Sequence, residues 1–267
     1  MTTSFAPCLD VRVNHVVRSF WQMQSEQACH EETILPKGVV ELIFSFQDAV
    51  PFQLENKALN GTTPRCFVSG MNDAPVQLKA PQRQLFFGVT LHPAALKKLL
   101  RVPSGRFLNT ITDLEEVHKG FGELWHRLAD ADSFADRVVI TQHWISQQQS
   151  QVHPQEMAIS AFLHTAPEPV SVAALAGRFC YSPRQLNRKS QEMFGMSTEG
   201  LIRYKRYLHA LRLMHQSTET LTRIGYDCHY YDQAHFSREF REFTGLTPGE
   251  YRQQKSTLPG HLFKNVR

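Results

Sequence analysis

Two short stretches of the sequence carry polar side chains that suit hydrogen bonding to the base edges and phosphates of DNA. Arginine can donate two hydrogen bonds to guanine and asparagine can pair with adenine, whereas lysine suits a phosphate contact. We therefore predict a DNA-contact set in two parts. The first part is Ser182, Arg184, Gln185, Asn187, Arg188 and Lys189, and the second is Asp232, Gln233, His235 and Arg238.

The first part lies where a helix is predicted to begin. Ser182 is a favourable N-cap, and Pro183 suits the first helical position because its missing N–H is not needed there. A helix is expected from there to Phe194. The preceding segment 172–179 reads as a short helix with apolar residues at helical spacing, and Cys180 and Tyr181 join the two. This pattern predicts a helix-turn-helix, whose second helix is suited to a major groove.

The same arrangement recurs fifty residues later along the chain. Segment 221–226 reads as a short apolar helix, segment 227–231 as a turn, and segment 232–240 as a second helix capped by Asp232. Between the two motifs, segment 198–216 predicts one long helix. A rigid spacer of that kind would hold the two motifs apart, and successive major grooves on one face of B-DNA lie about 34 Å from each other.

Residues 156–254 resemble the DNA-binding domain of the AraC/XylS-type transcription regulators. This resemblance implies a bacterial transcription regulator, either an activator or a repressor. It also implies double-stranded DNA as the partner, joined by RNA polymerase if the protein is an activator. The matching residues are Leu175, Ala176, Ser182 to Arg184, Leu186, Arg188, Gly195, Ser197, Arg206, Ala210, His235 to Phe240, Gly245 to Pro248, Tyr251 and Arg252.

Four positions depart from the pattern of that family. Cys180 and His229 stand where the turns have glycine, Gly225 stands where the second motif has alanine, and Ser190 replaces a phenylalanine. A residue with a side chain costs roughly 1 kcal/mol in the left-handed conformation, and glycine inside a helix costs about as much. We therefore expect backbone strain at Cys180 and His229.

The N-terminal half predicts a different architecture. Residues 1–110 contain β-prone runs separated by Pro, Gly and Asn turns, which favours a small barrel or jelly roll. Helices are expected at 92–100, 113–129 and 133–149, followed by a Gln-rich linker over 147–154. The expected fold class is α+β. The expected domains are a β-rich regulatory or dimerisation domain with a helical C-terminal part (1–152), a DNA-binding domain (155–254) and a tail (255–267).

A second, weaker resemblance links this half to the N-terminal domain of a subset of the same regulators. Its residues are Ile34 to Pro36, Glu41 to Phe44 and Gly88 to Pro93. The regulators of this family imply effector sensing or dimerisation for such a domain. A small-molecule effector and a homodimer are therefore expected as further partners, with neither identified by the sequence.

Charge and composition agree with this division. Residues 155–267 hold 15 Lys/Arg and 10 Asp/Glu, whereas residues 1–154 hold 14 and 15, so the positive charge lies with the paired helices. No apolar run approaches the ~18–20 residues that span a bilayer, and we expect a cytoplasmic protein without a membrane partner. The five cysteines show no CxxC spacing and favour free thiols in a reducing compartment.

Two other classes of function compete with a regulator. The first is a cupin-like metal-dependent enzyme, or a DNA-repair protein, that carries a DNA-binding module. Although the chain has 13 histidines, none show the H-x-H or H-x-x-x-H spacing of a metal site, and no G-x-S-x-G or Gly-rich phosphate loop occurs. We therefore predict no cofactor, no metal site and no catalytic residues. The second alternative is an N-terminal domain that only binds other proteins.

Overall fold

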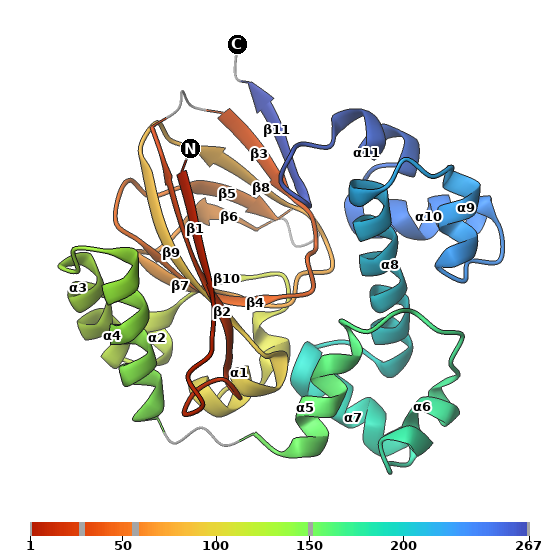
Figure 1. Cartoon of the computed structure of the whole chain (residues 1–267), viewed down its shortest axis with the longest axis horizontal. Coiled ribbons are helices and arrows are strands. Elements are labelled where there is room, and N and C mark those ends of the chain that lie inside the picture. Colours follow the sequence, from red (N-terminus) through yellow and green to blue (C-terminus); the bar gives the residue numbers. More distant parts are fainter. Residues whose placement is uncertain (1, 27–29, 55–58, 149–151, 266–267) are drawn as a thin grey trace.

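The computed structural model of the chain describes residues 2–26, 30–54, 59–148 and 152–265. Its N-terminal part contains two antiparallel sheets, and its C-terminal part is almost entirely helical (Figure 1). The α+β class predicted from the sequence is therefore confirmed. Cys29 and residues 149–151 of the expected linker lie outside the described residues.

The first sheet has six strands in the order β1-β2-β9-β4-β7-β10. Three of the predicted β-prone runs form its centre, because their apolar side chains are buried on both faces of the sheet. The strands are β1 (Thr2–Pro7), β2 (Val17–Ser25), β9 (Gln84–Leu91), β4 (Val40–Ser45), β7 (Cys66–Ser69) and β10 (Ile111–Asp113).

The second sheet has five strands in the order β11-β3-β8-β5-β6. Phe52, Leu54 and Val76 form a small apolar cluster on it, and Ile111 of the first sheet packs against this cluster. The strands are β11 (His261–Asn265), β3 (His30–Ile34), β8 (Val76–Ala80), β5 (Pro51–Leu54) and β6 (Leu59–Thr62). The prediction of a tail over 255–267 is therefore wrong for 261–265, because those residues gain a complete ladder of partners on β3.

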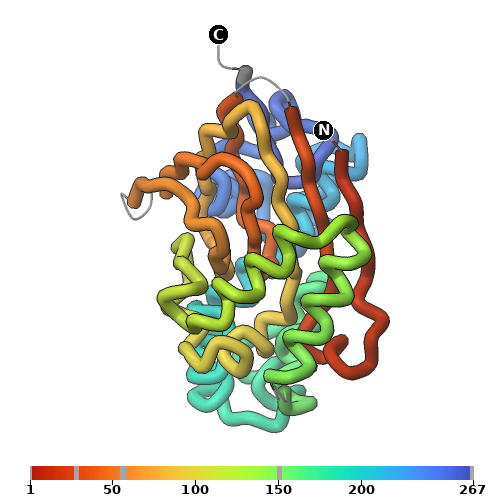
Figure 2. The backbone as a smooth tube through the Cα atoms, turned by 90° about the vertical axis from the view of Figure 1, so that its left-hand side faces the viewer, coloured from red at the N-terminus to blue at the C-terminus, as the bar shows by residue number. Residues whose placement is uncertain are grey.

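Helices cover the first sheet on its outer side and at one end. Helices α3 (Gly120–Ala129) and α4 (Phe134–Ser146) lie across the outer face, as Figure 2 shows in green. There the Trp125 indole donates to the Ser45 carbonyl (2.8 Å) and Phe134 packs on Phe87. The helix predicted over 113–129 is divided into α2 (Leu114–Val117) and α3, because His118 adopts an extended backbone between them. Helix α1 (Pro93–Leu100) and the short 3-10 helix η2 (Ser104–Phe107) close the lower end.

The C-terminal part is organised around the long helix α8 (Thr198–Gln216), as Figure 1 shows. The predicted order of elements is confirmed, although the second capped helix continues to Thr244 rather than ending at Phe240. The other helices are α5 (Pro154–Phe162), α6 (Val172–Arg178), α7 (Pro183–Phe194), α9 (Leu221–Asp227), α10 (Gln233–Thr244) and α11 (Pro248–Gln254).

One continuous hydrophobic core joins the first sheet to these helices, and the small apolar cluster of the second sheet is separate from it. At the seam between the two parts, the Tyr204 hydroxyl donates to the Asn72 carbonyl (2.6 Å) and accepts from the Gly38 N–H (3.0 Å). The Tyr207 hydroxyl donates to the Pro36 carbonyl at 3.1 Å. Burial raises the pKa of both phenols far above the ordinary value. These hydroxyls therefore stay protonated and keep donating to the N-terminal part.

Gly38 makes this close approach to α8 possible. Its φ is 69°, and a side-chain carbon added there would lie 2.4 Å from Cδ1 of Leu208. The left-handed conformation favours glycine where the N-terminal part meets the helix, and a side chain at this position would also have to displace the end of Leu208.

Candidate nucleic-acid interface

The first helix-turn-helix unit comprises α6, α7 and the turn between them. Ser171 caps α6 by accepting from the Ala174 N–H, and Ser182 forms a capping box with Gln185 at the start of α7. Cys180 lies in the turn at a φ of 57°, in the left-handed region. The expected strain position is therefore confirmed, and a hydrogen bond from the Tyr181 N–H to the Ala176 carbonyl (2.9 Å) closes the turn.

Helix α7 buries one face and exposes the other. The buried face comprises Leu186, Ser190, Met193 and Phe194. Ser190 occupies the position expected for phenylalanine, and its hydroxyl has no hydrogen-bond partner among the described residues. On the opposite face Arg184 and Arg188 are exposed, and neither makes a hydrogen bond or an ion pair to any described residue. These two guanidinium groups are the cationic groups of α7 that have no partner among the described residues.

The other predicted contacts of α7 hold the helix in place. Gln185 accepts from the Ser182 N–H (2.9 Å), and the Asn187 side-chain oxygen accepts from the Thr198 N–H (3.0 Å). Lys189 donates to Glu156 of α5 at 2.8 Å, and this hydrogen bond raises the pKa of Lys189. In this conformation the Asn187 side chain is tied to the start of α8, and the Lys189 ammonium is directed at a carboxylate.

The second unit repeats the design with α9, α10 and their turn. Thr220 caps α9, and the Asp232 carboxylate accepts from the His235 N–H at 2.7 Å. His229 lies at a φ of 61°, which confirms the second expected strain position. Gly225 is inside α9, and a side-chain carbon built there would meet the Cβ of Phe236 at 3.5 Å, an ordinary packing distance.

The second turn is one residue longer than the first. The left-handed residues Cys180 and His229 are 49 positions apart, whereas the caps Ser182 and Asp232 are 50 apart. The extra residue is Tyr231, which is 93% exposed beside the N-terminus of α10. Tyr231 was not among the predicted residues, although the unequal offsets in the sequence indicate one additional residue in the second turn.

The predicted contacts on α10 differ in how free they are. Gln233 accepts a hydrogen bond from the Thr222 hydroxyl at 2.8 Å. His235 is half-buried, with its ring edge-on to Tyr230 and its Nδ1 3.4 Å from the Tyr231 N–H. Arg238 is exposed and makes no hydrogen bond or ion pair to any described residue. Of the predicted residues in this unit, Arg238 is therefore the counterpart of Arg184 and Arg188.

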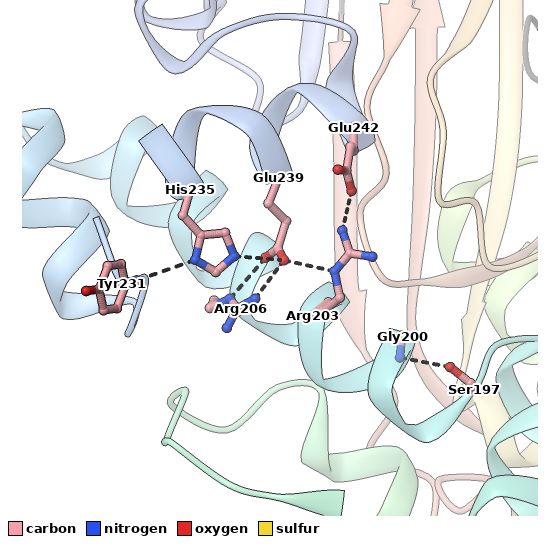
Figure 3. A network of polar contacts seen from close by, with 8 residues as sticks. All are labelled: Ser197, Gly200, Arg203, Arg206, Tyr231, His235, Glu239 and Glu242. Atoms are coloured by element: carbon pink, nitrogen blue, oxygen red, sulfur yellow. Dashed lines mark hydrogen bonds and ion pairs between the residues drawn. The ribbon is translucent and has the colours of Figure 1, made fainter. Parts of the chain in front are cut away.

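A buried carboxylate fixes α10 to α8 (Figure 3). Glu239 is 2% exposed and accepts from Arg203 Nε (2.9 Å) and from Arg206 Nε and Nη2 (3.0 and 2.6 Å). Burial alone would raise the pKa of Glu239, but the hydrogen bonds from the two arginines outweigh it and lower the pKa. Arg203 also reaches Glu242, and Arg206 lies over the Tyr230 ring at 4.7 Å. Glu239 is one of the residues that carry the family resemblance, but its role could not be predicted from the sequence.

A groove of about 610 Å³ separates the two units on this side of α8. Arg203, Arg206 and Arg238 line it together with His235 and Glu239. Glu199 and Glu242 also line it, so the groove carries both signs of charge, and Arg238 is the lining arginine that has no ion pair among the described residues.

One group of side chains in the N-terminal part has the composition of a metal site. Ligand atoms of Cys66, Asp113 and Glu115 lie within 4.8 Å of one another. However, Glu115 forms two hydrogen bonds with Arg65 (2.6 and 3.0 Å), and Asp113 caps α2. Burial raises the pKa of Cys66 to about 12, so the thiol stays protonated. These groups have structural partners, and nothing here supports metal-dependent chemistry.

Two further features of the chain bear on its class. Cys8, Cys66, Cys180 and Cys228 are free thiols, and burial raises the pKa of Cys228 to about 12. Across the described ranges, no helix combines the length and the apolar content that crossing a bilayer requires.

Comparison with known proteins assigns the two parts to two family models. Residues 175–254 match a helix-turn-helix domain, and residues 4–113 match a domain of unknown function (DUF6597). The transcriptional activator RhaS of Escherichia fergusonii is 35% identical over 86 residues, covering 32% of this chain and 31% of that protein. The transcriptional regulator GlxA of Rhizobium meliloti is 33% identical over 106 residues, covering 39% and 33%. The chain thus matches about one third of the length of these curated relatives.

Among solved structures, ToxT of Vibrio cholerae O395 aligns with 88% of this chain and 97% of its own. The TM-score is 0.49 and the sequence identity is 11%.

Proposed function

The chain belongs to the AraC/XylS-type transcription regulators, and we propose that it binds operator DNA by inserting α7 and α10 into two successive major grooves. Members of this family regulate transcription in bacteria and are not enzymes. The observation that carries the proposal is the pairing of two capped helices with exposed arginines on one rigid spacer helix. A cytoplasmic location follows from a DNA target.

In this proposal Arg184 and Arg188 of the first unit read base edges, because arginine in a major groove pairs best with guanine. Arg238 serves the second unit, either at a base or at a phosphate, with Gln233 and His235 beside it. Ser182 and Asp232 contribute by ordering the N-terminal turns, whose free N–H groups favour phosphate contacts. Gln185, Asn187 and Lys189 contribute through the position of α7, given the bonds they already make.

We further propose that residues 1–152 sense an effector, mediate dimerisation, or do both, and that residues 155–254 are the DNA-binding domain. The support is the direct packing of the N-terminal part on α7 and on the spacer helix α8. Lys97 of α1 forms an ion pair with Glu192 of α7 (3.2 Å), and Tyr204 and Tyr207 of α8 bond the loop around Gly38. A change in the N-terminal part would therefore reach α7 and α8 without an intermediate. RNA polymerase is a further partner if the regulator activates transcription.

The test begins with selection of the preferred duplex from a random library by the full chain. Binding of the selected and of a scrambled duplex is then measured by fluorescence anisotropy for the wild type and for Arg188→Ala. We expect the variant to lose about 1–3 kcal/mol on the selected duplex and to relax its preference at one base pair. Arg127→Ala, which removes an exposed arginine from α3, is the matched control and should bind as the wild type does.

Two results would count against this assignment. Equal losses on the selected and the scrambled duplex would mean that Arg188 only positions the DNA backbone. If the selection yields no preferred duplex and binding does not depend on salt concentration, the chain does not bind operator DNA as proposed.

A further inference from the structure

A pocket of about 360 Å³ lies within the helical part, beside the spacer helix α8. Its walls come from the end of α5, from segment 167–171 before α6, from α8 and from the turn of the second unit. Lys205 of α8 lines this pocket, although the residue is only 3% exposed. The pocket is therefore where a small molecule can meet a buried amine. Apolar side chains share the lining, namely Phe162, Pro167, Pro169, Val170 and Ile202.

The Lys205 amine is held in one orientation but has no close counter-charge. Its nitrogen lies 3.7 Å from the centroid of the Phe162 ring and donates to the Thr165 hydroxyl at 2.7 Å. That hydroxyl in turn donates to the Phe162 carbonyl (3.0 Å), so it accepts from the amine. Among the described residues the nearest carboxylate oxygen is that of Glu168, 4.0 Å away, and Glu168 is already paired with Arg178.

This environment makes Lys205 a better nucleophile than an exposed lysine. Burial lowers its pKa to about 8, although the charge of Glu168 acts in the opposite direction. At about pH 7.5 roughly a quarter of such an amine is neutral, compared with roughly one part in a thousand for an ordinary lysine. A neutral lysine amine in an apolar pocket attacks carbonyl compounds readily.

We propose that Lys205 is a covalent binding site for small aliphatic aldehydes, which enter this pocket and form an imine with the amine. The Nζ lone pair attacks the carbonyl carbon, and the carbonyl oxygen takes up one proton from the nitrogen to give a carbinolamine. The carbinolamine hydroxyl then leaves with a proton as water, while the nitrogen forms the C=N bond and gives up its second proton. One imine and one water result, without any oxidant or reductant.

The pocket suits both the reaction and its product. His229 and Glu168 line it and can exchange the protons that the two steps move. The neutral imine escapes the cost of burial that the ammonium bears, and the alkyl chain of the aldehyde has Pro169, Val170 and Ile202 to pack against. An effect of this reaction on operator binding would rest on the proposed function, whereas the site itself does not.

The experiment treats the folded full chain with butanal and sodium cyanoborohydride, which reduces imines to stable secondary amines, at about pH 7.5. Peptide mass spectrometry then measures the rate of alkylation at each lysine. We expect Lys205 to react about tenfold faster than Lys119, an exposed residue just before α3. In urea that unfolds the chain, the two rates should become equal because the pocket is lost. An aldehyde attached to a polymer too large for the pocket should alkylate Lys119 but not Lys205.

Two substitutions test the amine and the pocket separately. Lys205→Arg keeps a cation beside Phe162 but removes the nucleophilic amine, so the fast alkylation should disappear, whereas the matched control Lys119→Arg should retain it. Ile202→Trp narrows the pocket without touching the amine's hydrogen bond and should slow alkylation of Lys205 about tenfold. The comparison of native and unfolded wild type decides the question even if a variant does not fold.

Four results would overturn the proposal. Alkylation of Lys205 no faster than that of Lys119 in the folded chain would show that the amine is not a preferred site. A fast reaction that persists in urea would assign the reactivity to the local sequence. Rapid reaction of Lys205 with the polymer-linked aldehyde would place the amine on the open surface. An unchanged rate in folded Ile202→Trp would show that the aldehyde does not occupy the pocket.

Discussion

The two helix-turn-helix units have nearly the same internal geometry but are held by different parts of the molecule. The first unit packs directly on the N-terminal part, where Lys97 pairs with Glu192, and a side-chain carbon added to Gly195 would come within 2.9 Å of Gly105. The second unit is held by the spacer helix, through the buried carboxylate of Glu239. The position of the first unit therefore depends directly on the N-terminal part, whereas the position of the second unit depends on α8.

This difference in attachment indicates which unit a conformational change in the N-terminal part would affect directly. Adjacent residues of α8 face the two units, Lys205 toward the segment before α6 and Arg206 toward α10. Arg206 has a carboxylate within 2.6 Å, whereas the nearest carboxylate oxygen to Lys205 is that of Glu168 at 4.0 Å. We expect the second unit to depend on one strong ionic contact and the first on dispersed packing.

The largest test of this comparison removes the charge of Glu239. Glu239→Gln leaves two arginines beside a buried amide, and we expect it to lower the free energy of unfolding by about 3 kcal/mol. Urea denaturation measures the change. Glu242→Gln in the same helix is the control, because Glu242 is 53% exposed and pairs with the same Arg203, so its loss should stay below about 1 kcal/mol. Similar losses in the two variants would mean that the buried pair does not hold the second unit.

The second test concerns Lys205, which is 3% exposed. Its ammonium lies 2.7 Å from the Thr165 hydroxyl and 3.7 Å from the Phe162 ring centroid. Burial lowers its pKa from 10.5 to about 8, although Glu168 acts in the opposite direction. Because the folded pKa lies below the unfolded one, the folded state pays the full cost of the charge below pH 8, and stability rises with pH between 8 and 10.5.

We therefore expect Lys205→Met to be more stable than the wild type by about 1–2 kcal/mol at pH 7. The advantage should shrink above pH 8 and disappear near pH 10.5. Chemical denaturation at several pH values measures it, with Lys119→Met, at the exposed residue just before α3, as a control that should change little at any pH. A destabilised Lys205→Met at pH 7 would show that the hydroxyl and ring contacts outweigh the cost of burial.

The smallest effects are expected at the two turns, where the units should behave alike. Cys180 and His229 are exposed at nearly the same φ, so Cys180→Gly and His229→Gly should each raise stability by up to about 1 kcal/mol. Melting temperature and DNA affinity are measured on the same samples. Weaker DNA binding by His229→Gly alone would assign the imidazole a phosphate contact, and a loss of stability in both would contradict the strain.

Local signals in the sequence predicted the local features of the fold. The caps at Ser182 and Asp232 and the left-handed residues Cys180 and His229 follow from rules that act over a few neighbouring residues, and the structure has them in place. The central strands were also predictable, because runs of apolar and β-branched residues between turn residues are typical of β-strands. The DNA-contact residues themselves remain a prediction.

Contacts between distant residues could not be predicted in this way. Lys189 was predicted to contact a phosphate. In the structure its ammonium donates to Glu156, which lies on a different helix. Glu239 lies 33 positions from Arg206, and no periodicity in the sequence connects a carboxylate on one helix to arginines on another. The pocket beside Lys205 combines residues of α8 with residues of the second turn and of the segment before α6, so it is visible only after folding.

Strand β11, which follows the helical part in the sequence, pairs with strand β3 of the N-terminal part. It pairs with β3 from His261↔Ile34 to Asn265↔His30, and His261 Nδ1 lies 2.5 Å from Glu32 Oε1. During synthesis the N-terminal segments leave the ribosome first, and the edge of β3 stays unpaired by β11 until residues 261–265 emerge. An open strand edge is a template for pairing with other chains. The sheet that contains β3 is therefore completed only by a strand that follows both helix-turn-helix units in the sequence.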